Sequence, residues 1–560
     1  MGDNQTTLNM ANISRTRNPN LFEILPLDIF RIIMFDEILN SSHEPTSAEW
    51  AEWAEEPRYQ PRYTRQEIKS ARLVCTSWNR LIEGDPLIWN VIKIHNRNSI
   101  RLAHLAVKRS LGQAVHVFIS SVLETDGCTL SENYGPKWDS HIEGYKILRK
   151  LLPRCITLSI SISSDSPIHP KLPVVASLEA PLLRRVILRV LPRNFGFNHT
   201  RYGPHLGLFI RFVDFLRTIP MPNLKEFSVS GFLLYGSSAS VNLDFIPFSQ
   251  LESLHIKFPA TLSTLAEPLA ADEMNSIFSR YQNIRNLRIQ FQSLVHVVDI
   301  RSVLEIPYLT KLILSSCTLL HNSPMTLSSP VALTELSFRG MFRSSSIKPG
   351  AGAIMGVLAY LPQLKKLQLE LSGNVHPPAT TPTSLANLEH VLLLAEDDII
   401  FVFFRSFLIP QLRGLSIEWR PLGFPFTPKP NIIDPFPLLQ DLELKPGPRG
   451  YPLRIFLPCS PGLRRLIYHD HDPRFSPLSC LYHGKDSPNE PILCPELECI
   501  VLADDSNAGV CYPHQHATLD DIVRSRKVGV EQGRCVDMKL IWLQGNDAPE
   551  FGTGYPFSKF

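Results

Sequence analysis

The carboxyl-terminal part of the sequence contains one cluster of residue types that bind zinc. Cys511 is followed by His514 and His516, and Cys494 and Cys499 lie upstream as further thiol ligands. Structural zinc sites usually space their ligands as C-x2-C or H-x3-H pairs. Because this cluster departs from that spacing, we interpret it as a polar loop before a terminal helix, and we expect no metal and no other cofactor.

A second set of metal-ligating side chains, His469-Asp470-His471-Asp472, directly follows an expected strand and precedes Pro473, which is typical of a turn. No Gly-rich phosphate loop follows a strand, and neither a G-x-S-x-G nor an H-E-x-x-H motif occurs. Cys75 is flanked by packing residues and is expected in a core. We therefore expect no catalytic residues and no enzyme activity.

The composition favours a repeat protein. Leucine occurs 77 times and proline 47 times in 560 residues, which favours many short apolar segments with rigid breaks between them. The 56 basic and 53 acidic side chains nearly balance, so the chain lacks the charge of proteins that wrap nucleic acid or coat an anionic membrane. An apolar fraction of 44% is too high for a largely disordered chain.

Compartment signals are few. Ten cysteines are scattered singly, and the amino terminus has no apolar segment of the signal-peptide kind. The best candidate for a membrane span, Ile399–Phe404, has six residues, whereas a spanning helix needs about 18. We expect a reducing, intracellular environment, cytoplasmic or nuclear or both, and no membrane or nucleic-acid partner.

Residues 21–94 differ from the rest of the chain and are expected to be helical. Leu25–Leu39 forms the first expected helix, with Pro26 in its first turn, where the missing N–H costs little. Apolar side chains occupy all sides of this helix, and a small module cannot bury all of them. Ser70–Ile82 forms another expected helix. The surplus apolar surface either docks another protein or packs on the following domain.

Three short motifs stand in a fixed order in this module: Leu25-Pro26-x-Asp28-Ile29, then Leu73-Val74-Cys75-x-x-Trp78-x-x-Leu81-Ile82, then Asp85-Pro86-Leu87-x-Trp89. In this order they resemble the F-box, a small helical bundle that binds a Skp-type adaptor and, through it, a cullin–RING ubiquitin ligase. The resemblance implies that the adaptor is bound by Leu25, Pro26, Ile29, Ile33, Val74, Trp78, Leu81 and Trp89.

The module departs from the F-box pattern in a long insertion, residues 40–64, where F-boxes usually turn faster. The insertion is acidic and bounded by prolines, so it can loop out at little entropic cost. Alternatively, it adds a contact of its own through Trp50 and Trp53.

From about residue 95 onward the chain repeats a Leu-x-x-Leu-x-Leu unit or its apolar equivalent. Successive units begin 24 to 41 residues apart, and several steps fall in the window of about 20–29 residues of leucine-rich repeats. Each unit is expected to form one short strand whose two alternating apolar residues point into a common core. The units begin at Leu183, Leu224, Leu251, Ile284, Leu309, Leu333, Leu364, Leu388, Leu412, Leu439, Leu463 and Leu497.

Weaker units flank this array. Ser99–Ser110 is expected to be a helix that leads to a strand over Val115–Phe118, and Ile156–Ile160 is another expected strand. At the far end, a helix over Leu519–Arg526 and a strand over Val536–Trp542 form an expected terminal cap. The array resembles the irregular leucine-rich repeats that commonly follow an F-box.

The remaining side chains of each strand point away from the core and are either a solvated sheet face or a partner-binding face. We expect a binding face that is basic from Lys257 to Lys366 and acidic from Glu418 to Glu443, with an exposed apolar strip at Leu392 and Leu394. The candidate substrate-binding residues are His255, Lys257, Arg288, Arg339, Lys366, Glu370, Leu392, Leu394, Glu418, Glu443 and Arg465.

The sequence therefore predicts an α+β protein: a disordered tail over 1–20, an F-box-like module over 21–94, an irregular leucine-rich-repeat solenoid of horseshoe form over 95–545, and a tail over 546–560. The predicted function is that of a substrate-recognition subunit of a Skp–cullin–F-box ubiquitin ligase that binds an unidentified protein. The alternatives are an adaptor-bound scaffold with no role in degradation and, less favoured, a zinc- or cysteine-dependent enzyme at the carboxyl-terminal end.

Overall fold

The computed structural model describes residues 76–94, 97–120, 144, 146–163, 179–191, 218–230, 248–257, 278, 281–291, 297–315, 317–320, 331–339, 351–371, 382–420, 435–445, 453, 456–469, 478, 481, 492–504 and 513–544. The chain divides into two compact units, residues 1–161 with 178–183 and residues 162–177 with 184–560, and each is described by itself.

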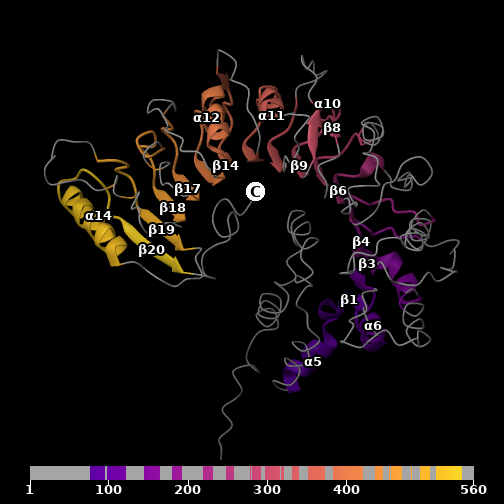
Figure 1. Ribbon diagram of the computed structural model, residues 1–560. Helices are drawn as coiled ribbons and strands as arrows, with labels where there is room; N and C mark the ends of the chain where they lie inside the picture. Colours follow the sequence, from indigo (N-terminus) through magenta and orange to yellow (C-terminus); the bar gives the residue numbers. More distant parts are fainter. Residues whose placement is uncertain are drawn as a thin grey trace, which may run out of the picture. The chain divides into compact units, whose positions relative to one another are not determined.

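The main sheet contains sixteen parallel strands, which follow one another in sequence order (Figure 1). Each strand is short, as expected for a repeat in which one strand alternates with a connecting segment. The strands are β1 (Val91–Ile94), β2 (Val115–Ser120), β3 (Cys155–Ser163), β4 (Arg185–Leu191), β5 (Glu226–Ser230), β6 (Ser253–Lys257), β7 (Asn286–Gln290), β9 (Lys311–Ser315), β11 (Glu335–Arg339), β12 (Lys366–Glu370), β14 (His390–Glu396), β16 (Gly414–Arg420), β17 (Asp441–Lys445), β18 (Arg465–His469), β19 (Cys499–Asp504) and β20 (Lys539–Gln544).

The described helices lie between these strands in the chain. They are α5 (Thr76–Gly84), η3 (Pro86–Trp89), α6 (Arg97–Arg109), η4 (Leu152–Arg154), η5 (Phe248–Gln250), α10 (Ile300–Leu304), α11 (Ala351–Leu358), α12 (Asp397–Ser406) and α14 (Pro513–Glu531). Two small parallel pairs accompany them, β8 (Val297–Asp299) with β10 (Thr318–Leu320) and β13 (Thr383–Ser384) with β15 (Phe407–Leu408). Within the described parts of the chain, every helix is too short or too polar to cross a membrane.

The leucine repeat builds the core beneath the main sheet. All twelve residues that begin the predicted units, from Leu183 to Leu497, are at most 1% exposed. In each strand the two apolar residues that follow, such as Leu312 and Leu314 of β9, are buried as well. Burying a leucine side chain contributes about 1.5–3 kcal/mol, so every repeat adds its own share to the stability of the sheet.

A proline turn leads into most of these strands. Before β9, the N–H of Leu309 donates to the carbonyl of Ile306 at 3.3 Å, which closes a turn with Pro307 at its second position. Proline is favoured there because its ring fixes φ near the value that the turn needs. The same arrangement recurs before β12, β16 and β17, with Pro362, Pro410 and Pro437 two residues ahead of the buried leucine.

Aromatic side chains fill the space under α12. The ring of Phe404 lies 5.4 Å from the rings of both Phe436 and Phe456, and Trp419 lies 6.1 Å from Phe456. These rings are buried and meet edge to face, the arrangement that aromatic pairs prefer. Figure 1 shows α11 and α12 on the same side of the sheet. The apolar run Ile399–Phe404 is thus buried as part of helix α12.

The described chain is therefore an α/β protein with a long parallel sheet of sequential strands, consistent with a repeat solenoid. The repeat strands predicted from Leu251 onward are confirmed, as are the flanking strands near residues 115, 156 and 539 and helix α6. The sheet differs from the prediction at its beginning, because β1 lies within the predicted module 21–94 and pairs with β2. The expected helix Leu25–Leu39, the insertion 40–64 and both tails lie outside the described residues.

Candidate functional site

Strand register arranges the outward side chains of the second unit in three rows that cross the sheet. From β4 onward the first row is Arg185, Glu226, Ser253, Asn286, Lys311, Glu335, Lys366, His390, Gly414, Asp441 and Arg465. The middle row is Ile187, Ser228, His255, Arg288, Ile313, Ser337, Gln368, Leu392, Ser416, Glu443 and Ile467. The third row is Arg189, Ser230, Lys257, Gln290, Ser315, Arg339, Glu370, Leu394, Glu418 and Lys445.

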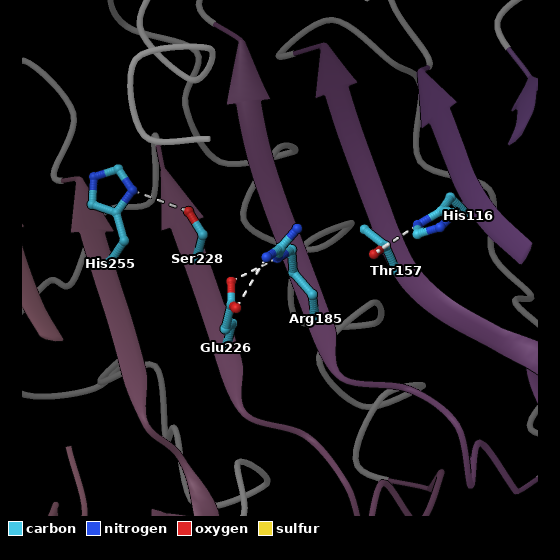
Figure 2. Close-up of polar contacts among 6 residues, drawn as sticks. All are labelled: His116, Thr157, Arg185, Glu226, Ser228 and His255. Atoms are coloured by element: carbon cyan, nitrogen blue, oxygen red, sulfur yellow. Dashed lines mark hydrogen bonds and ion pairs between the residues drawn. The ribbon is translucent and has the colours of Figure 1, made fainter. Parts of the chain in front are cut away.

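Ion pairs between neighbouring strands hold the first row together. Arg185 binds Glu226 through two hydrogen bonds of 2.6 and 2.9 Å, which Figure 2 shows side by side. Farther along, Glu335 lies 2.7 Å from Lys311 and 3.6 Å from Lys366. Burial alone would raise the pKa of Glu335, but the charges and hydrogen bonds of these two lysines outweigh it and lower the pKa.

The same pairing occurs at the far end of the first row, where Arg465 lies 2.6 Å from Asp441. Ion pairs on the same face thus involve Lys366, which contacts Glu335, and Arg465, which contacts Asp441. The predicted separation into a basic and an acidic stretch is therefore weaker in this row than the sequence suggested.

His255 lies in the middle row among positive charges. The residue is 8% exposed, and its Nδ1 lies 3.1 Å from Ser228 Oγ on the neighbouring strand (Figure 2). Burial lowers the pKa of His255 well below 6.5, and the charges of Arg288, Lys257 and Arg189 lower it further. The ring is therefore neutral at neutral pH.

Arg339 of β11, which the sequence places in the basic stretch, is held by its neighbour on β12. With the Gln368 amide oriented so that its oxygen faces Arg339, this oxygen accepts hydrogen bonds from Arg339 Nε at 3.1 Å and Nη2 at 2.7 Å, and the amide nitrogen donates to Ser337 Oγ at 2.9 Å. The cations that act on His255 instead lie on β4, β6 and β7.

A buried polar network crosses β16, β17 and β18 in the second unit. Ser416 Oγ donates to Glu443 Oε2 at 2.9 Å, and His469 Nε2 lies 3.2 Å from Glu443 Oε1. All three side chains are at most 5% exposed. The histidine contacts the carboxylate and not the serine hydroxyl, so the arrangement supports packing of polar groups rather than activation of a nucleophile.

Three candidate substrate-binding residues are buried, which corrects the expectation that they are displayed to a partner. His255, Leu392 and Glu443 are 8%, 4% and 4% exposed, so the apolar strip at residues 392–394 is not exposed as expected. All three belong to the middle row, where side chains of both flanking strands and both other rows crowd together. The others are exposed or half-buried: Lys257, Arg288, Arg339, Lys366, Glu370, Leu394, Glu418 and Arg465.

Sequence reasoning missed Arg189, which lies in the third row and whose charge acts on His255. The signal was available, because counting from the buried Leu183 places Arg189 at an outward position of its strand. Arg185 and Glu226 were missed in the same way.

The expected adaptor-binding residues are mostly outside the described part of the chain. This holds for Leu25, Pro26, Ile29, Ile33 and Val74, whereas Trp78 and Leu81 lie on helix α5 with side chains that are not described.

Trp89, the last of the expected adaptor contacts, is buried inside the first unit. Its Nε1 donates to the carbonyl of Ile82 at 2.6 Å, and the Arg109 guanidinium lies 4.7 Å from the centre of its ring. Arg109 also pairs with Glu83 at 3.2 Å. In the described residues, Trp89 therefore fastens η3 to α5 and α6.

The metal-ligand candidates of the sequence are separated or only partly described. His469 belongs to the Glu443 network, Cys494 Sγ contacts the carbonyl of Leu457 at 3.5 Å, and Cys511 lies outside the described residues. Within the part of the chain that the structure describes, no three metal-ligating side chains come together. Burial raises the pKa of Cys155 to about 12, so this thiol stays protonated at neutral pH.

Comparison with known proteins does not identify a family. No protein-family model matches the chain, and no curated protein matches it. Among solved structures, a structural-genomics protein from Bacteroides fragilis matches with 12% identity over 52% of this chain and 76% of that chain, with a TM-score of 0.26. A likeness of this size carries no argument about fold or function.

Proposed function

We propose that this protein is a substrate-recognition subunit of a Skp–cullin–F-box ubiquitin ligase. The amino-terminal module binds a Skp-type adaptor, and the outward face of the repeat sheet binds the target protein. The observation that carries the proposal is the order of the three F-box-like motifs between Leu25 and Trp89, followed directly by a long parallel repeat sheet.

The proposed role requires no chemistry from this chain. A receptor that holds a target beside a ubiquitin-charged enzyme raises the effective concentration of the target lysine and makes the transfer effectively intramolecular. A broad sheet whose outward face carries paired charges fits such a role, because it offers many contacts to a bound protein.

Co-purification of the full chain with a Skp-type adaptor tests the proposal. We expect a stable complex with the unaltered chain and at least about a tenfold loss of adaptor binding after combined substitution Ile29→Ala and Ile33→Ala. Leu438→Ala is the matched control, since Leu438 is an exposed apolar residue in a turn of the repeat sheet, far along the chain from the module. Failure of the unaltered chain to bind the adaptor would overturn the proposal.

A reconstituted ubiquitin-transfer reaction distinguishes the proposed ligase subunit from the alternative of an adaptor-bound scaffold with no role in degradation. A protein captured by the full chain is incubated with the adaptor, a cullin–RING core and a charged conjugating enzyme. Ubiquitin attached to the captured protein, and lost with the Ile29→Ala/Ile33→Ala chain, supports the receptor; binding without transfer favours the scaffold.

A further inference from the structure

Positive charge is concentrated on the outward face of β4, β5, β6 and β7. Arg189, Lys257 and Arg288 are close enough to His255 to act on its ionisation. Glu226 is the one carboxylate at an outward position of these four described strands, and it is bound by Arg185 at 2.6 Å. In the first row from β11 to β18, by contrast, carboxylates are paired with cations, Glu335 with Lys366 and Asp441 with Arg465.

Two buried polar atoms in this region lack a hydrogen-bond partner within the described residues. They are Nε2 of His255, a residue that is 8% exposed, and Oε1 of Gln290 on the adjoining strand β7. A buried polar atom without a partner costs free energy, so a ligand that supplies one gains affinity. The amide oxygen of Gln290 can only accept a hydrogen bond, and a free anion has no N–H or O–H group to donate one. An acidic peptide offers both groups, because its side chains are anionic and its backbone N–H groups are donors.

We propose that the outward face of β4–β7, with Arg189, Lys257 and Arg288 around His255, binds an acidic segment of a partner protein. Under the proposed function this segment belongs to the ubiquitination target, so the inference names the chemistry of that target. Lys257 and Arg288 are only partly buried, so part of each long cationic side chain is accessible to a bound anion.

The dimensions of the face suit a short extended peptide. Four neighbouring parallel strands span about 15–20 Å across the sheet, the length of about five or six extended residues. Ser228, Ser230 and Ser253, with Asn286 and Gln290, line the same face and provide hydroxyl and amide groups for the peptide backbone.

The same face is poorly suited to nucleic acid. Proteins that bind single strands combine positive charge with aromatic side chains on which the bases stack. No Phe, Tyr or Trp stands at the outward positions of β4–β7, and the carboxylates Glu370, Glu418 and Glu443 farther along the rows would repel a continuing phosphate backbone.

Fluorescence anisotropy with the full chain tests the proposal. The probes are a labelled oligoglutamate peptide, its oligoglutamine counterpart, a phosphoserine peptide and a single-stranded RNA. We expect the acidic peptides to bind at least about tenfold more tightly than oligoglutamine, with an affinity that falls as salt is added. Tighter binding of oligoglutamate assigns carboxylates as the preferred anion, and tighter binding of the phosphoserine peptide assigns phosphate.

Charge reversal locates the site. The double change Lys257→Glu and Arg288→Glu should weaken oligoglutamate binding by about tenfold or more, while Arg413→Glu with Lys445→Glu, which alters the net charge by the same amount, should leave it within about twofold. Lys257→Gln removes one positive charge and introduces no negative one, so it should cause an intermediate loss of oligoglutamate affinity. This variant replaces the charge-reversal chain if that chain does not fold.

Three outcomes overturn the proposal: equal binding of oligoglutamate and oligoglutamine, equal loss in both double variants, or tighter binding of the RNA with the same sensitivity to Lys257 and Arg288. Adaptor binding is measured in parallel with the Ile29→Ala/Ile33→Ala chain. That chain should keep its affinity for oligoglutamate, and the Lys257→Glu/Arg288→Glu chain should keep the adaptor, so the failure of one proposal does not conceal the failure of the other.

Discussion

Buried polar side chains on the outward face meet two opposite environments. The carboxylate of Glu443 has a donor from Ser416 and contacts His469, so its charge is surrounded by hydrogen-bonding groups. His255 instead lies among three cations and has one partner, Ser228, among the described residues. Hydrogen bonds to a buried carboxylate stabilise the fold, whereas cations beside a histidine ring oppose its protonation.

The lowered pKa of His255 predicts a loss of stability in weak acid. Below about pH 6.5 the unfolded chain protonates this histidine while the folded chain does not, so the free energy of unfolding should fall as the pH drops from 6.5 toward the lower folded-state pKa. His255→Gln should flatten this part of the pH profile in urea titrations. His104→Gln, which changes an exposed histidine of α6, is the control; an identical flattening by both would contradict the prediction.

Ser416→Ala should destabilise the protein by about 1–3 kcal/mol, because the Oε2 atom of buried Glu443 loses the donor that lies 2.9 Å away. Urea denaturation measures the change. Ser253→Ala, at a half-exposed position of β6, should cost less than about 0.5 kcal/mol. An equal effect of the two substitutions would show that the contact with Glu443 contributes nothing.

At the scale of elements, the proline turns and the buried leucines act together. Each turn leads directly into the next strand, and the side chain of the leucine that closes the turn is buried in the core. Where the turn is tight, even a methyl group has no space. A Cβ at Gly462 would lie 2.9 Å from the carbonyl oxygen of Pro437 in the preceding turn.

Gly462→Ala should therefore destabilise the sheet around β18 by about 1–3 kcal/mol, since the clash is with backbone that cannot rotate away. Thermal unfolding of the full chain measures it. Gly84→Ala is the control, because no atom lies within 4 Å of a Cβ built there. A neutral result at Gly462 would mean that the neighbouring turns can separate at no cost.

Phe404→Ala should cost about 3–5 kcal/mol, because it opens a cavity between the rings of Phe436 and Phe456 under α12. Denaturation in guanidinium measures this loss. Phe404→Leu, which keeps most of the volume, should recover more than half of it; equal losses would mean that the site collapses after truncation.

Strands and core leucines could be predicted from the sequence because one spacing recurs in each unit and Leu-x-Leu fixes which residues face inward. The small pairs β8–β10 and β13–β15 could not, since strands of two or three residues carry no periodic signal. The outward rows were predictable in membership but not in burial. Whether His255, Leu392 or Glu443 is covered depends on residues of neighbouring strands, which are 24 to 41 positions away in the chain.

At the scale of the whole molecule, each strand of the main sheet pairs with the strands that come before and after it in that sheet, in sequence order. Stability in such an array is a sum of repeat and neighbour terms, so damage should stay local. Leu367→Ala in β12 should increase amide hydrogen exchange in β11 and β14 well before β5 and β6 are affected. A uniform rise along the second unit would indicate one cooperative block.

The sequential order of the strands also bears on how the chain is made. A strand that pairs first with its predecessor does not have to wait for residues that are still to be synthesised. At ribosomal speeds of about 5–20 residues per second, a repeat of some 25 residues emerges every one to five seconds, far longer than a short strand needs to add to an existing edge. The sheet can therefore grow strand by strand during translation, and its last exposed edge moves toward the carboxyl terminus until β20 joins.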